Sequence, residues 1–113
     1  MALTLWHNPR CSKSREALAL LQARGVAPEL RLYLKTPPTE AELRGILARV
    51  GVPAGGLVRR KEATFRDLGL ADADEAALVA AMAAHPVLIE RPILDDGVRA
   101  VIGRPPEAIL DLL

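Results

Sequence analysis

The sequence predicts an α/β fold built on a four-stranded mixed sheet flanked by helices. The first observation is a strand-helix-strand pattern at the start of the chain. Alternating apolar residues over 2–6 and 29–34 predict strands, and helical spacing over 12–24 predicts a helix that ends at Gly25. The second is Asp96-Gly97 between two apolar runs, which indicates a β-hairpin formed by Ile93–Leu94 and Val98–Ile102. Because a helix joins them, the first two strands should be parallel.

Composition limits the classes of protein that the chain can form. Its 113 residues predict one domain, and 50% of them are hydrophobic but only 3% aromatic, so Leu, Val, Ile and Ala should fill the core. A net charge of +1 argues against nucleic acid or an acidic membrane as a partner. One cysteine excludes an internal disulfide and fits a reducing compartment. Without a leader or membrane-span pattern, we expect a cytoplasmic protein.

Helices should fill the middle of the chain, between the second and third strands. After Pro37-Pro38, Thr39 and Glu42 form a capping box, and Gly51 closes the helix that follows. The apolar face of this helix should be Leu43, Ile46, Leu47 and Val50. The less regular stretch after it predicts a helical turn within 55–61 and a short helix over 62–68. A further helix should be capped by Asp72 or Asp74 and run through residue 84. A last helix should begin at Pro105-Pro106, with Ile109, Leu110 and Leu113 on its apolar face.

This order of elements is that of the thioredoxin-like fold, with a helical insertion at about residues 39–70. We therefore predict a single domain over residues 1–113. In that fold a cis-proline commonly precedes the third strand and faces the cysteine, so we predict a cis Arg91–Pro92 bond.

Cys11 lies between the first strand and the first helix, where free N–H groups of the helical turn stabilise a thiolate. Arg10, Lys13 and Arg15 add positive charge around it. An inert buried cysteine is the plain alternative, but these cations and small polar neighbours favour a reactive thiol. No metal-ligand spacing is present, and Ala17 stands where a cysteine phosphatase needs arginine. Since Ser14 replaces the second cysteine of a C-x-x-C motif, an outside thiol must resolve any adduct.

The chain resembles the glutaredoxin-dependent arsenate reductase family over about residues 3–113. The resemblance is carried, in family order, by His7-Asn8-Pro9-Arg10-Cys11, Tyr33-Leu34-Lys35-Thr36-Pro37-Pro38-Thr39, Leu57-Val58-Arg59, Leu68-Gly69-Leu70, His85-Pro86, Arg91-Pro92-Ile93 and Gly103-Arg104-Pro105. It is most similar to the shorter branch with Cys-Ser-Lys-Ser, since Ser12-Lys13 replaces the Gly-Thr of other members.

The resemblance implies an oxidoreductase of arsenic resistance that reduces arsenate. Cys11 would attack arsenate, glutathione would then join the arsenic as co-substrate, glutaredoxin would supply the reducing step, and no cofactor or metal would be bound. Arg59, Arg91 and Arg104 match the catalytic arginines, which suits a tetrahedral oxyanion, although Arg60 adjoins Arg59 and leaves that choice open.

Two further residues match the family. His7 would help to hold the thiolate, with a packing histidine as the alternative. Ser14 would hydrogen-bond the thiolate and contact substrate, with a helix-capping hydroxyl as the alternative.

Two other functions stay open from the sequence. A monothiol, glutathione-dependent oxidoreductase would need no set of three arginines to clamp its disulfide substrate. The Spx regulators share this architecture and bind RNA polymerase, but typically lack the three arginines. We expect the chain to act as a monomer.

Overall fold

The computed structural model describes residues 2–113, which divide into two compact units. The sheet unit comprises residues up to 36 together with 91–113, and the helical unit comprises residues 37–90. The helical unit thus contains the expected insertion of about 39–70 and also the helix that follows it. A single domain over residues 1–113 stays a prediction.

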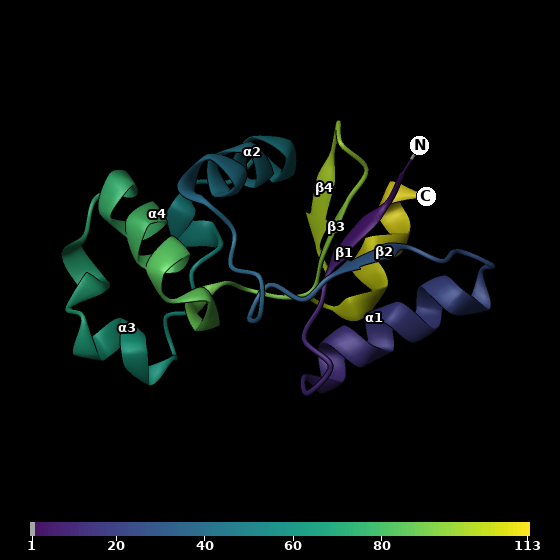
Figure 1. The fold of residues 1–113 in the computed structure, drawn as a ribbon, viewed down its shortest axis with the longest axis horizontal. Coiled ribbons are helices and arrows are strands. Elements are labelled where there is room, and N and C mark those ends of the chain that lie inside the picture. Colours follow the sequence, from purple (N-terminus) through teal and green to yellow (C-terminus); the bar gives the residue numbers. More distant parts are fainter. Residues whose placement is uncertain (1) are drawn as a thin grey trace. The chain divides into compact units, whose positions relative to one another are not determined.

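The sheet unit contains a four-stranded mixed sheet, as predicted (Figure 1). Its strands are β1 (Thr4–Trp6), β2 (Glu29–Arg31), β3 (Ile93–Asp95) and β4 (Ala100–Ile102), in the spatial order β2-β1-β3-β4. Strand β1 pairs parallel with β2 and antiparallel with β3, so that Leu5 lies between Leu30 and Leu94. Strand β4 pairs antiparallel with β3. The parallel pair and the hairpin are both confirmed.

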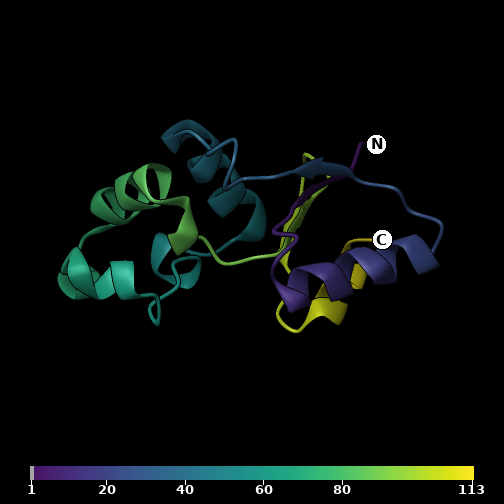
Figure 2. The same ribbon diagram turned by 60° about the horizontal axis from the view of Figure 1, so that its bottom comes forward.

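Helix α1 (Ser12–Ala23) and the C-terminal 3₁₀ helix (Pro106–Leu112) lie side by side against one face of this sheet (Figures 1 and 2). Fully buried side chains from α1, the 3₁₀ helix and the sheet form the core between them: Leu5, Ala17, Leu21, Leu94 and Ile109. Burial of each leucine or isoleucine in this set stabilises the unit by about 1.5–3 kcal/mol. The prediction that Leu113 belongs to the apolar face of the last helix is wrong, because it lies beyond the last turn and is 51% exposed.

Several strand boundaries differ from the sequence prediction. Strand β1 begins at Thr4 rather than at residue 2, and β3 extends to Asp95 rather than ending at Leu94. The run over 29–34 leaves the sheet after Arg31, because the N–H groups of Lys35 and Thr36 both donate to the Leu32 carbonyl and turn the chain. Strand β4 begins at Ala100 rather than at Val98. The Asp96 carboxylate accepts hydrogen bonds from the N–H groups of Val98 and Arg99, which form the hairpin turn with Gly97.

The helical unit contains α2 (Glu40–Val50), α3 (Ala63–Asp67) and α4 (Glu75–Ala84). The Thr39–Glu42 capping box opens α2, and Gly51 ends it in the left-handed region, both as predicted. Asp74 caps α4 by accepting from the Ala77 N–H, whereas Asp72 lies in a short 3₁₀ turn. No helix formed by residues 2–113 is long and apolar enough to cross a membrane.

Candidate active site

Cys11 is the N-cap residue of α1, directly after the loop that leaves β1. Its backbone is extended, with φ −94° and ψ 123°, and its side chain is partly exposed. The loop is held by local hydrogen bonds. The Cys11 N–H donates to the Asn8 carbonyl at 3.0 Å, and the Arg10 N–H donates to Asn8 Oδ1 at 3.0 Å. The thiol is therefore presented at the start of a helix by a loop that local hydrogen bonds hold in place.

The surroundings of Cys11 favour its thiolate. Burial raises the pKa of the thiol, but the Ser14 backbone N–H, the Arg91 charge and the Lys13 backbone N–H oppose this effect. The Arg91 side chain also hydrogen-bonds the sulfur, and the net result is a pKa below the ordinary value for cysteine. Because the thiolate is the nucleophilic form, Cys11 is activated for attack on an electrophile.

His7 contacts Ser14. Its Nδ1 lies 2.6 Å from the Ser14 hydroxyl, which also accepts the Asn8 N–H at 3.1 Å. Burial, together with the nearby charge of Arg15, lowers the pKa of His7 and favours the neutral imidazole. These contacts join the end of β1 to the first turn of α1, whose N–H groups face the sulfur. A role for His7 in holding the thiolate and a hydrogen bond from the Ser14 hydroxyl to it stay predictions.

Arg91 precedes the β3–β4 hairpin and Arg104 follows it, and hydrogen bonds join these two segments. The Arg91–Pro92 bond is cis, as predicted from the sequence. The Arg104 Nε donates to the Arg91 carbonyl at 2.9 Å, and the Gly103 N–H donates to the Pro92 carbonyl at 2.8 Å. The Arg104–Pro105 bond is also cis, which the sequence analysis missed. The sheet unit thus brings Arg91 to the thiol and Arg104 to Arg91.

Arg59 belongs to the helical unit, where an antiparallel bridge between Val58 and Ile89 fixes the backbone beside it. Its guanidinium lies 3.0 Å from the Glu62 carboxylate and donates to the Val87 carbonyl at 3.3 Å. The guanidinium of Arg60 instead stacks over the Phe65 ring, 5.5 Å from its centroid. Sequence reasoning missed Glu62, although its spacing three residues after Arg59 is a usable signal.

Among residues 2–113, no three His, Cys, Asp or Glu side chains gather closely enough to hold a metal ion.

The fold and this site define a thioredoxin-like protein with an activated cysteine at its first strand-to-helix junction. Residues 6–112 match the model of the ArsC family. The chain belongs to the ArsC family.

Similar proteins cover nearly the whole chain. It is 46% identical over 110 residues to the arsenate reductase of Neisseria meningitidis serogroup A, spanning 95% of this chain and 94% of the relative. It is 49% identical over 112 residues to the uncharacterized protein YfgD of Escherichia coli K12, spanning 96% and 94%. The solved structure of the arsenate reductase from Vibrio cholerae superposes with a TM-score of 0.96 at 45% identity, covering 100% of this chain and 98% of that one.

Proposed function

We propose that this protein is an arsenate reductase that uses Cys11 as its nucleophile and depends on glutathione and glutaredoxin. The observation that carries the proposal is the thiol with a lowered pKa at a helix N-terminus, contacted by Arg91. Membership of the ArsC family supports it, since relatives that match nearly the full chain are arsenate reductases.

In the first step the Cys11 thiolate attacks the arsenic atom of arsenate. A sulfur–arsenic bond forms and an arsenic–oxygen bond breaks, and the hydroxide that leaves takes up a proton and departs as water. Arg91 and Arg104 would neutralise the oxyanion charge through charge-assisted hydrogen bonds. Arg59 would supply a third guanidinium, with its direction set by Glu62.

Reduction then requires two electrons, and the chain has no second cysteine to provide them. A glutathione thiolate would replace a second hydroxyl on arsenic, again releasing water. A glutaredoxin thiolate would then attack the glutathione sulfur, forming a disulfide and leaving the electron pair of the sulfur–arsenic bond on arsenic. Hydrolysis of the remaining bond frees arsenite and Cys11. In sum, arsenate and two thiols give arsenite, one disulfide and water.

The contacts of His7 suit a supporting role in this reaction. A neutral imidazole at Nδ1 can accept the Ser14 hydroxyl while that hydroxyl accepts the Asn8 N–H. This arrangement would keep the first turn of α1 in place, so that the Ser14 N–H stays aimed at the sulfur.

The test is NADPH oxidation coupled through glutathione reductase, with arsenate, glutathione or glutaredoxin omitted in turn. We expect turnover only when all three are present, and none with Cys11→Ser. A mixed disulfide of glutathione is the comparison substrate. Efficient turnover of this disulfide with no arsenate-dependent rate would contradict the proposal and favour a monothiol oxidoreductase.

A further inference from the structure

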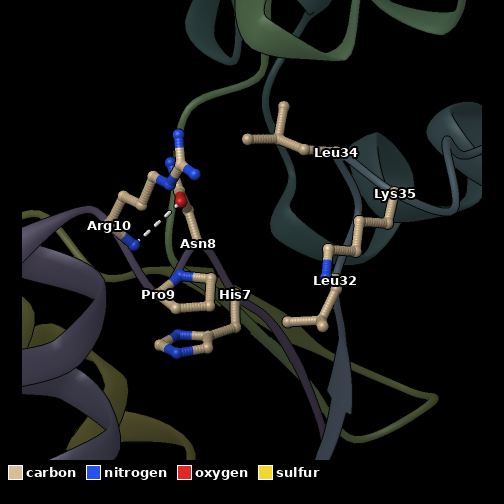
Figure 3. Close-up of a pocket in the computed structure, with 7 residues that line it drawn as sticks. All are labelled: His7, Asn8, Pro9, Arg10, Leu32, Leu34 and Lys35. Atoms are coloured by element: carbon tan, nitrogen blue, oxygen red, sulfur yellow. Dashed lines mark hydrogen bonds between the residues drawn. The ribbon is translucent and has the colours of Figure 1, made fainter.

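A cavity of about 420 Å³ lies in the sheet unit, beside the loop that leads to Cys11 (Figure 3). Residues 7–10 line one side, and Leu32, Leu34 and Lys35 from the turn after β2 line the other. Figure 3 shows the two leucine side chains reaching toward the loop. A volume of this size is typical of sites for small organic ligands, which fall between about 300 and 1,000 Å³.

The lining combines positive charge with apolar surface. Arg10 and Lys35 are both exposed, and no acidic side chain lines the cavity. Within residues 2–113, neither cation forms an ion pair. Pro9, Leu32 and Leu34 supply the apolar part, and Leu34 is 43% exposed. An inorganic oxyanion alone would not use that apolar surface, so this lining fits a small organic molecule that carries carboxylates.

The position of the cavity relative to Cys11 further limits the class of ligand that it would bind. Arg10 lines the cavity and is followed directly by Cys11, and the Cα atoms of adjacent residues are about 3.8 Å apart. A peptide of three residues spans up to about 10 Å when extended. Such a ligand could place its carboxylates at Arg10 and Lys35 while its other groups reach an adduct on Cys11.

We propose that this cavity binds the thiol co-substrate, a short peptide thiol with carboxylate groups of the glutathione class. Its role as the second thiol on arsenic rests on the proposed function, because the single cysteine leaves that step to an outside thiol. The reaction steps are those already given, and the cavity adds the site from which the thiol is delivered. Arg10 and Lys35 bind its carboxylates, and Leu32 and Leu34 contact its carbon skeleton.

The first test uses S-methylglutathione, which cannot react, and needs no arsenate. We expect saturable binding by calorimetry, with amide NMR shifts concentrated at residues 7–11 and 32–35. The double variant Arg10→Gln, Lys35→Gln should raise Kd about tenfold, because two charge-assisted contacts are lost. Arg24→Gln is the matched control, since Arg24 is an exposed arginine at the far end of α1, and it should bind like wild type.

A second variant keeps both cations. Leu34→Asp replaces an exposed side chain, so folding should survive, and it places a negative charge in the cavity. We expect it to weaken S-methylglutathione binding at least as much as the double variant does. Wild-type affinity in both variants, or NMR shifts confined to other residues, would overturn the assignment.

Steady-state kinetics separate this proposal from the proposed function. The double variant should raise KM for glutathione about tenfold and leave KM for arsenate unchanged. If the double variant turns over arsenate with an unchanged KM for glutathione, the cavity assignment is refuted but the proposed function is not. Intact S-methylglutathione binding in a protein without arsenate turnover would instead refute the proposed function.

Discussion

The close packing of Gly103 against Pro92 predicts that Gly103→Ala damages both stability and the thiol. A Cβ on Gly103 would lie 2.7 Å from Pro92 Cγ and 3.0 Å from Ile109 Cγ2. Pro92 is buried and Ile109 is fully buried, so neither can move without disturbing the core. Because Arg91 precedes Pro92 and contacts the Cys11 thiol, a displaced Pro92 should also weaken the support of the thiolate.

The size of the effect follows from the packing. One methyl group forced into a packed site costs about 1–3 kcal/mol of unfolding free energy. For a chain of this length, each kcal/mol lowers Tm by about 4 °C, so we expect a fall of about 4–12 °C. Displacement of Arg91 should raise the pKa of Cys11 toward its ordinary value, because a positive charge moves away from the thiolate.

The assays are thermal unfolding by circular dichroism and the rate of Cys11 alkylation by iodoacetamide as a function of pH. Gly45→Ala is the matched control. Its Cβ would meet only the end of the flexible Arg49 side chain at 3.1 Å, and alanine favours a helix interior by about 0.5–1 kcal/mol. Wild-type Tm and alkylation profile in Gly103→Ala would refute the reasoning.

Three further predictions concern single side chains. Arg91→Gln should raise the pKa of Cys11, seen as slower alkylation at neutral pH, and lower kcat/KM for arsenate about 10²–10³-fold. The pKa of His7 in the folded chain lies below its ordinary 6.5, so the unfolded chain binds the proton first, and stability is lost as pH falls through about 6.5. His7→Gln should flatten that loss in urea unfolding between pH 7.5 and 5.5. Thr39→Ala should cost about 1 kcal/mol of unfolding free energy in the same assay, because it removes the cap of α2.

Local signals in the sequence predicted most of the fold. Helix α2 begins at a capping box and ends at a glycine with a positive φ. Both signals act through neighbouring residues alone, so they can be recognised in the sequence. The end of β2 could not be predicted in this way. The alternation continues to Leu34, but the chain turns at Leu32 without the aid of glycine or proline, because its carbonyl accepts two N–H groups.

The candidate site was partly predictable. Cys11 could be identified because its activation depends on the adjacent helix turn. The contact of His7 with Ser14 and that of Arg104 with the Arg91 carbonyl depend on pairing between segments that are distant in the sequence. No local pattern encodes such contacts, and they were found only in the folded chain.

The central claim is that the Cys11 thiolate reduces arsenate, and direct speciation of arsenic tests it most closely. Arsenite would be quantified by chromatography and elemental mass spectrometry after incubation with arsenate, glutathione and glutaredoxin. Wild-type protein and Cys11→Ser would be compared at equal concentrations, after circular dichroism has shown both to be folded. We predict arsenite formation above the protein-free rate with wild type alone. Equal arsenite formation by the two proteins, or none above background by either, would contradict the account.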